Sequence, residues 1–515
     1  MTTIVLTRIA IETVAPLAIY SGERETLGHN AIVRDWNGLP YIPATAIAGV
    51  WRHTVRNICG NRVNPIKFLY WFGQSSGDLE ERMASRITVT DGLLLDESSC
   101  LPGAFSDGRK LRMLTGYNRE DRIYSLTDIN ASGRFERTSC RMNARKAGHK
   151  GALFTGKTLP KGLRFAFDVK FELDSEDDLK QYREVLKVIG SRSFALGART
   201  ANGQGAFRVI GVDLEEINLE SCASDPAKAA EKIRAFAVSR MVRIAKDEEL
   251  PKLSELIPSD DGTELRTWKF RLSSQGTMRI GTGTPGDISG NVSAVDCFGK
   301  PICLMAGEDG SVKSNQQDCF SDVRIQWNGT RFAGEVREFI IPGRTIKGIL
   351  AHRTMYHFLR RKGWFADSAV RENGQKPQDL INCLLENQAP PPEFEPFYAL
   401  FGRNDPQNPD NMLSGSLKVH DSVINADSWI CRMHNRLDRF TAGVMPSALF
   451  GQMRLVNPSF EISISLNPSR AALLPENSEI MLAFNDTLED LRQGFLNICA
   501  GAGRDTAVFS EVKEN

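Results

Sequence analysis

The chain carries one segment twice, as LPYIPATAIAGVWRH at residues 39–53 and as EFIIPGRTIKGILAHR at residues 338–353. Three more blocks recur in the same order: FLYWFG (68–73) as FYALFG (397–402), SRITVTDGLLL (85–95) as GSLKVHDSVI (415–424), and CRMNARKAGHKGALF (140–154) as CRMHNRLDRFTAGVMPSALF (431–450). Self-similarity within a chain indicates a repeated structural unit. We therefore predict a first module over residues 1–215, a second module over residues 265–515, and a helical linker over residues 216–264.

The overall composition is typical of a globular protein and excludes several classes of function. The 64 Lys and Arg residues nearly balance the 63 Asp and Glu residues, so the net charge of +1 does not by itself predict a polyanionic partner. The ten cysteines form no CxxC pair, which argues against a zinc ribbon. The sequence has neither a signal-peptide layout nor an apolar run of membrane length. We expect a cytoplasmic protein with reduced cysteines and no membrane contact.

The repeated segment predicts a strand, a turn and a helix in each module. Pro43 and Pro342 end a short strand, because proline has no N–H for the strand ladder. Thr45 and Thr345 then stand where the N-cap of an apolar-periodic helix is expected. The free backbone N–H groups of such a helix start bind phosphate readily. The pattern indicates an α+β fold with a possible phosphate contact in each module.

Cations are clustered locally although the net charge is small. Residues 134–164 hold nine Lys and Arg residues against the single acid Glu136, and residues 344–362 hold six and no acid. The glycine-rich stretch LGARTANGQGAFRVIGV (196–212) adds Arg199 and Thr200 among its turns. Local cation density governs phosphate binding, and glycine-rich turns allow a phosphate close to the backbone. A solvated charged face is the alternative reading, but patches in both modules favour RNA.

These segments resemble one family. IPATAIAGVWR and IPGRTIKGILAHR are similar to the Ile-Pro-Gly-Ser-Ser-Leu-Lys-Gly-x-x-Arg segment of the RAMP superfamily, and LGARTANGQGAF resembles its late glycine-rich loop. The first copy has Ala44 and Ala48 where the family has Gly and Lys, while the second keeps Gly343 and Lys347. The similarity is greatest to the backbone subunits of CRISPR type III effectors, in the tandem form of the III-D subtypes.

The resemblance implies two RRM-like (ferredoxin-type) modules in tandem, each with an inserted β-hairpin thumb, over about residues 115–153 and 425–449. It also implies guide RNA, target RNA and other effector subunits as partners. The residues expected to contact RNA are Thr45, Arg52, Arg141, Arg145, Lys150, Arg199, Thr200, Arg344, Thr345, Lys347, Arg353, His434, Arg436 and Arg439.

Family members often cut the target RNA with an aspartate that lies upstream of the Ile-Pro segment. His29 falls at that place in the first module, with Asp35 shortly after it. In the second module Asp322 and Asp318 are the nearest candidates, and Asp296 competes with them because of an insertion. The RNA 2′-OH would be the nucleophile. Asp322 or Asp318 would accept its proton or hold Mg²⁺, since that ion prefers carboxylate oxygens.

Two alternatives to an RNA-guided endoribonuclease stay open. The chain can be a non-catalytic RNA-binding scaffold, or it can be a guide-RNA-processing endoribonuclease. The sequence separates the catalytic and scaffold readings only at His29, Asp322, Asp318 and Asp296. A repeated thumb argues against the processing enzyme, which has no evident need for regular spacing along RNA.

Overall fold

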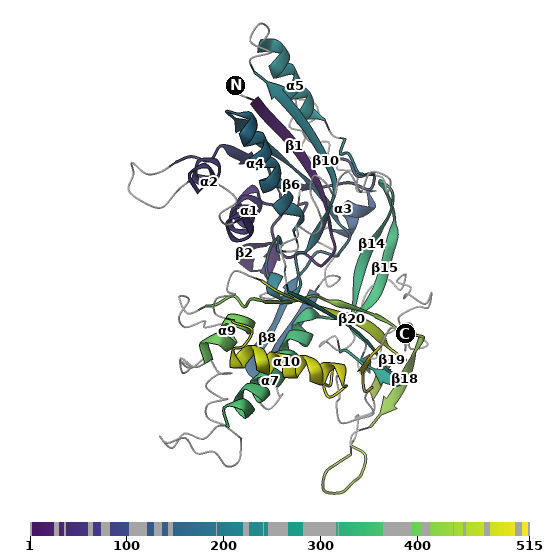
Figure 1. The fold of residues 1–515 in the computed structure, drawn as a ribbon. Coiled ribbons are helices and arrows are strands. Elements are labelled where there is room, and N and C mark those ends of the chain that lie inside the picture. The colour runs from purple at the N-terminus through teal and green to yellow at the C-terminus, as the bar shows by residue number, and fades with distance from the viewer. Residues whose placement is uncertain are drawn as a thin grey trace.

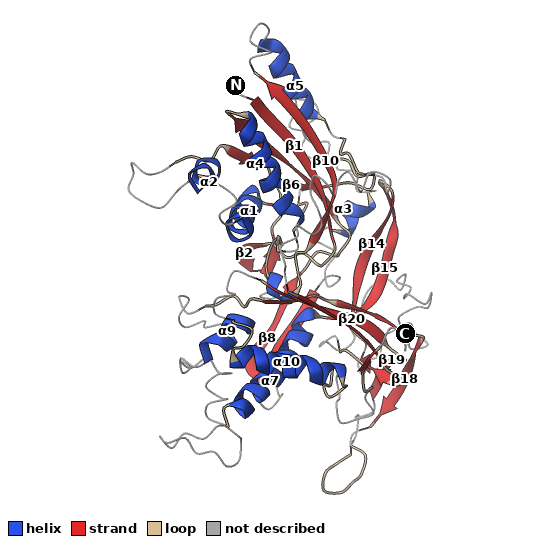
Figure 2. Cartoon of the chain, viewed as in Figure 1, coloured by secondary structure: helices blue, strands red, loops and turns tan. Residues whose placement is uncertain are grey.

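The computed structural model describes residues 3–24, 30–35, 38–59, 65–73, 83–101, 121–127, 136–142, 148–191, 193–219, 226–239, 241–245, 266–281, 316–317, 319–363, 394–403, 412–435, 437–445, 450–467, 474–499 and 507–512. Helices and several β-sheets are mixed along the chain, as expected for an α+β protein (Figure 2). Within the described residues no helix is long and apolar enough to span a membrane.

The first module is built around an antiparallel sheet with the strand order β10-β1-β9-β6-β4, in which β5 also pairs with β9. These strands are β1 (Thr3–Thr13), β4 (Tyr41–Ile42), β5 (Ile87–Val89), β6 (Gly92–Leu94), β9 (Arg164–Leu173) and β10 (Phe207–Asn218). The module's helices are α1 (Ala44–Cys59), α2 (Pro65–Phe72), α3 (Arg122–Leu126) and α4 (Glu176–Lys187). Strand β10 continues past the predicted module boundary at residue 215.

The second module repeats this arrangement with the strand order β21-β11-β20-β17-β15-β14, and β16 also pairs with β20. Its strands are β11 (Thr267–Ser273), β14 (Ser321–Asn328), β15 (Arg331–Ile341), β16 (Leu417–Val419), β17 (Ser422–Asn425), β20 (Ser459–Leu466) and β21 (Ser510–Glu511). Its helices are α7 (Gly343–Arg361), α9 (Glu395–Phe401) and α10 (Glu479–Arg492). The repeated sequence blocks fall on corresponding elements, such as α1 and α7.

Two smaller sheets hold the segments predicted as thumbs. In the first module β7 (Glu136–Met142) and β8 (Gly148–Lys157) form an antiparallel pair, beside β2 (Tyr20–Arg24) and β3 (Asn30–Ile32). In the second, β18 (Ser428–His434) pairs with β19 (Phe450–Val456), beside β12 (Thr277–Met278) and β13 (Gln316–Gln317). The pair β7–β8 overlaps the interval predicted for the first thumb, whereas β19 follows the interval predicted for the second, and both thumbs stay predictions.

Within the described residues of the linker lies the helix α5 (Pro226–Val238), which packs on the back of the first sheet. Ile4, Leu6 and Ile217 of the sheet pack with Phe236 of this helix. Arg8 reaches across from β1 and donates to the carbonyl oxygens of Phe236 (3.1 Å) and Ser239 (2.6 Å), at the end of the helix. A cation at a helix C-terminus satisfies carbonyls that lack partners within the helix. The central strand β1 is therefore buried on both faces.

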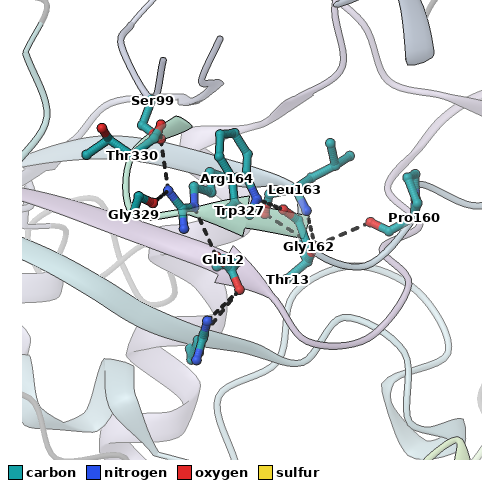
Figure 3. Close-up of polar contacts among 11 residues, drawn as sticks. Glu12, Thr13, Ser99, Pro160, Gly162, Leu163, Arg164, Trp327, Gly329 and Thr330 are labelled. Atoms are coloured by element: carbon teal, nitrogen blue, oxygen red, sulfur yellow. Dashed lines mark hydrogen bonds and ion pairs between the residues drawn. The ribbon is translucent and has the colours of Figure 1, made fainter. Parts of the chain in front are cut away.

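The two modules lie end to end, and each sends a hairpin toward the other (Figure 1). The hairpin β14–β15 of the second module runs alongside the first, where Trp327 donates from Nε1 to the carbonyl oxygen of Gly162 at 2.7 Å. Arg164 of the first module stacks over the Trp327 ring at 4.0 Å and donates to the Gly329 carbonyl at 2.8 Å (Figure 3). Glu12 neutralises Arg164 at 2.9 Å. This contact fixes the hairpin against the first sheet.

We expect Trp327→Ala to weaken the contact between the modules, because it removes the ring under Arg164 and the donor to Gly162. The half-buried position predicts a loss of about 2 kcal/mol, below the range for fully buried aromatics. The midpoint of urea unfolding, followed by circular dichroism, should fall and limited proteolysis should separate the modules sooner. Arg331→Ala, at an exposed site in the same hairpin, is the control. A midpoint that does not move for Trp327→Ala would contradict this role.

Candidate nucleic-acid interface

Both repeated helices begin with a backbone N–H bonded to a carboxylate. Ala44 N, in the first turn of α1, donates to Asp91 Oδ1 at 2.7 Å. Gly343 N, in the first turn of α7, donates to Asp421 Oδ1 at 2.7 Å. The capping residues predicted from the sequence, Thr45 and Thr345, lie one or two residues inside the helices, so that prediction was wrong. At both helix starts a carboxylate lies where a phosphate was expected.

The sequence held a signal for these capping carboxylates. Asp91 and Asp421 occupy the same place in the recurring blocks TVTDG and KVHDS. Each lies in the turn between two short strands, β5 and β6 or β16 and β17. A carboxylate near a helix N-terminus is stabilised by the helix dipole. The recurrence marked these residues, but their partners lie 47 and 78 residues away along the chain.

Arg137 carries the contact from the first module to the second. Its Nη1 donates to Asp421 Oδ2 at 2.8 Å, and its Nη2 forms an ion pair with Asp322. The guanidinium is almost fully buried. Burial lowers the pKa of Arg137, but Asp322 and Asp421 outweigh this, and the pKa is raised. This strand of the first hairpin is thus anchored by two carboxylates of the second module.

This geometry bears on Asp322, the residue predicted to be catalytic and to hold Mg²⁺. Its Oδ2 faces Arg137, and its Oδ1 accepts a hydrogen bond from the N–H of Val323 at 3.0 Å. The side chain is buried in the contact between the modules. Among the residues that the structure describes, no three His, Cys, Asp or Glu side chains form a group that could hold a metal ion. Because Oδ2 of Asp322 faces Arg137 and its Oδ1 is bonded to Val323 N, this side chain does not fit a Mg²⁺ site.

The other predicted catalytic residues are placed as follows. Asp35 closes a turn, since its Oδ1 accepts a hydrogen bond from Leu39 N at 2.9 Å. His29, Asp318 and Asp296 lie outside the described residues. Their catalytic roles stay predictions.

The glycine-rich loop of the first module packs on the repeated turn of the second. A Cβ on Gly343 would lie 2.2 Å from Val419 O and 2.9 Å from Asn202 O. A Cβ on Gly203, whose φ is +83°, would lie 2.6 Å from the same Val419 O. Backbone atoms of three segments therefore meet with no room for a side chain. The contact brings Arg199 and Thr200, predicted from the first module, next to the start of α7.

The contact between the glycine-rich loop and the start of α7, which we call the junction, holds more positive charge from arginines than its acidic side chains neutralise. Arg344 Nη2 donates to Thr138 O at 2.7 Å, and the nearby Asp421 offsets only part of its charge. Burial, then repulsion by Arg137 and Arg199, lowers the pKa of Arg344 to about 10. Arg199 lies over the ring of Phe154 at 5.0 Å. Within the described part of the chain, neither Arg199 nor Arg344 forms an ion pair.

Several donors at this junction are buried with no hydrogen-bond partner in the described structure: Arg199 Nη1, Arg344 Nη1, Tyr20 Oη and Ser139 Oγ. Two of them converge over Gly156, where an added Cβ would lie 2.8 Å from Tyr20 Oη and 3.4 Å from Arg199 Nη1. A buried donor without a partner costs about 1–3 kcal/mol, and more when it is charged. An anion placed among these donors would satisfy them. We call Arg199, Arg344, Tyr20 and Ser139 the junction cluster.

The remaining predicted RNA contacts are spread over the chain. Lys347 is buried and donates to Leu417 O at 2.9 Å, and burial lowers its pKa to about 8. Arg353 is paired with Asp490 at 2.5 Å, on the helical side of the module. Arg52 is half-buried on α1, while Arg141 and Lys150 lie on β7 and β8 but their side chains are not described. His434 ends β18, Arg439 is exposed in the loop that follows, and Arg145 and Arg436 lie outside the described residues.

The comparisons with known proteins bear on the first half of the chain. The sequence model of the RAMP superfamily matches residues 10–208, from β1 to the start of β10. This match supports the family resemblance over the first module and fits a CRISPR-associated RNA-binding protein. A search of curated proteins finds no match to the chain.

We expect Gly343→Ala to destabilise the junction, because the new Cβ would overlap the Val419 carbonyl. Overpacking of this kind costs about 1–3 kcal/mol. Gly348→Ala is the matched control in the same helix, where a Cβ meets nothing within 4 Å. That control should keep the protein's stability or raise it by up to about 1 kcal/mol. Thermal unfolding of both variants measures the difference, and equal melting temperatures would refute the close approach.

Proposed function

We propose that this chain is an RNA-binding backbone subunit of a CRISPR type III effector of the III-D kind. In this proposal it consists of two RRM-like RAMP modules in tandem, each with a thumb hairpin. The similar strand order of the two large sheets and the repeated sequence blocks support a duplication. The match of residues 10–208 to the RAMP superfamily supports the family. The chain would bind guide RNA and position complementary target RNA beside other effector subunits.

The junction cluster is the observation that carries the RNA-binding proposal. Arg199 and Arg344 come from different modules, lie near enough for Arg199 to contribute, after burial, to lowering the pKa of Arg344, and make no ion pair among the described residues. A guanidinium offers several donors in a plane that suits phosphate oxygens. A phosphate of the RNA backbone would satisfy the unpartnered donors and balance the charge. The site would therefore hold the RNA at the joint between the modules.

We expect Arg199→Ala and Arg344→Ala each to weaken binding of a single-stranded RNA by about tenfold, since a charged hydrogen bond is worth about 1.5–3 kcal/mol. Each should also lower the slope of log affinity against log salt by about one, as expected for one lost phosphate contact. Fluorescence anisotropy over a salt series measures both quantities. Arg183→Ala, which removes an exposed arginine on α4 that pairs with Glu216 at 3.4 Å, is the control.

A loss of the same size in the Arg183 control would point to bulk charge instead of a site. Arg199→Lys and Arg344→Lys separate charge from geometry, since lysine keeps the charge but lacks the planar fork. Circular dichroism of every variant excludes unfolding as the cause. Unchanged affinity in both alanine variants would overturn the junction as an RNA site.

The proposal extends to cleavage of the target RNA. The 2′-OH would attack the adjacent phosphorus and expel the 5′-oxygen, which leaves a 2′,3′-cyclic phosphate and a 5′-hydroxyl. His29 suits the role of acid or base, because its unperturbed pKa is about 6.5. Mg²⁺ would need carboxylates other than Asp322, such as Asp318 or Asp296.

The non-catalytic scaffold is the second candidate, and one observation favours it. Asp322 and Asp35, two of the five predicted catalytic residues, hold structural hydrogen bonds in the fold. In this case the chain would arrange RNA and leave cleavage to its partners. A cleavage assay with variants of the five predicted catalytic residues, described next, decides between the endoribonuclease and the scaffold.

We expect cleavage of a complementary RNA by the assembled complex to be lost at one cut site when the catalytic residue of one module is replaced. The variants are His29→Ala, Asp35→Ala, Asp296→Ala, Asp318→Ala and Asp322→Asn. Product ends are read by phosphatase sensitivity on a sequencing gel, and 2′,3′-cyclic ends are the expected product. Each variant complex should still bind the RNA. An unchanged cut pattern in all five would leave the scaffold as the function.

A further inference from the structure

One face of the β7–β8 hairpin borders most of the junction cluster. Ser139 of β7 pairs with Phe154 of β8, so both side chains point to the same side of the hairpin. Gly156 belongs to that side as well, because side chains alternate along a strand. Arg199 lies over the Phe154 ring at 5.0 Å. A Cβ on Gly156 would approach both Tyr20 Oη and Arg199 Nη1, so glycine leaves open the space that these two groups border.

The second module brings Arg344 to the same strand. Its Nη2 donates to Thr138 O at 2.7 Å, beside Ser139. Arg344 Nη1 and Ser139 Oγ are both buried without a hydrogen-bond partner in the described structure. Burial, then repulsion by Arg137 and Arg199, lowers the pKa of Arg344 to about 10. Contact between the modules therefore brings together like charges and buried donors, and both oppose that contact.

The unpartnered groups of the junction cluster define the ligand that would relieve this opposition. They are two guanidinium N–H groups and two hydroxyls, and they come from β2, β7, the glycine-rich loop and α7. The ligand needs negative charge and several acceptor oxygens. A tetrahedral oxyanion presents its oxygens in different directions and can bond to groups of both modules at once, whereas a carboxylate has two oxygens in one plane.

We propose that the junction cluster is a latch that a tetrahedral oxyanion closes: the anion bridges Arg199 of the first module and Arg344 of the second, and it stabilises the contact between the modules. This inference rests on the proposed function and describes the regulation of the same site. An RNA phosphate and a free inorganic phosphate would supply the same group. Because the anion favours the closed joint, the closed joint binds the anion more tightly in return.

The test uses the full chain and inorganic phosphate, with chloride at equal ionic strength as the reference. Isothermal titration calorimetry should show a single saturable phosphate site. The midpoint of thermal unfolding should rise by about 2 °C for each tenfold increase in phosphate above its dissociation constant. Hydrogen exchange should slow at the amides of β7 and of the first turn of α7, because these segments meet at the junction.

Arg344→Gln removes the charge and keeps an amide donor. In chloride this variant should unfold at or above the wild-type midpoint, because the repulsion by Arg199 is gone, and phosphate should no longer raise its midpoint as in the wild type. Arg183→Gln, at an exposed site on α4, is the control and should keep the full rise. Phosphate also stabilises proteins through exclusion from their surface. An equal rise in the Arg344 variant would therefore indicate an adventitious ion only and overturn the latch.

Tyr20→Phe is a milder variant that removes one hydroxyl donor and no charge. It should weaken phosphate binding about tenfold while the midpoint in chloride stays at the wild-type value, since one hydrogen bond to a charged group is lost. Unchanged phosphate affinity in this variant, together with unchanged affinity in Arg344→Gln, would place the anion elsewhere and overturn the latch.

Single-stranded RNA separates the latch from the proposed function. RNA should raise the wild-type midpoint, and free phosphate should weaken RNA binding more than chloride of equal ionic strength does. RNA binding that depends on Arg199 without any phosphate-specific stabilisation would leave the proposed function standing and overturn the latch. A chain that binds phosphate at the junction but binds no RNA would keep the latch and overturn the proposed function.

Discussion

The relative position of the two modules depends on one buried guanidinium. Arg137 leaves the first hairpin and ends between Asp322 and Asp421 of the second module. Taking such an ion out of water costs several kcal/mol, which only well-placed opposite charges offset. Asp421 in turn caps the start of α7, so a side chain of the first module completes the charge balance of a helix start in the second. The Arg164–Trp327 contact adds a second attachment in the opposite direction, from the second module to the first.

The duplicated motif has different neighbours in its two copies. Asp91 and Asp421 cap equivalent helices, but Asp91 is exposed, whereas Asp421 is covered by Arg137. Gly343 allows the glycine-rich loop of the first module to approach, and in the first copy the half-buried Ala44 stands at the corresponding position. The helix start is therefore covered by the other module in the second copy and partly exposed in the first copy. The second copy has glycine at this position because the glycine-rich loop packs against it, whereas the first copy has alanine.

Under the proposed function, this arrangement also bears on where RNA would bind. In RRM-type domains, bases stack on the open face of the sheet. Here α5 covers the back of β1, and Arg8 ties the helix to the sheet, so that face is occupied. Arg199 and Arg344, which make no ion pair among the described residues, lie elsewhere. Burial and repulsion by Arg137 and Arg199 lower the pKa of Arg344, and a phosphate bound there would offset this. In the proposal, the RNA contact therefore lies at the joint between the modules instead of on the sheet.

The sequence alone determined the α+β character, the repeat and the glycine-rich loop, because these depend on short-range patterns: proline ending a strand, apolar periodicity, and glycine at tight turns. It also selected Arg344 by local cation density and Arg199 by its glycine-rich loop. It could not show that these two arginines meet, since 145 residues separate them in the chain. For the same reason it assigned Asp322 to catalysis, while the fold pairs this carboxylate with Arg137, 185 residues away. Local propensity acts over a few residues, whereas the charge that a buried side chain meets is set by segments that only tertiary packing brings together.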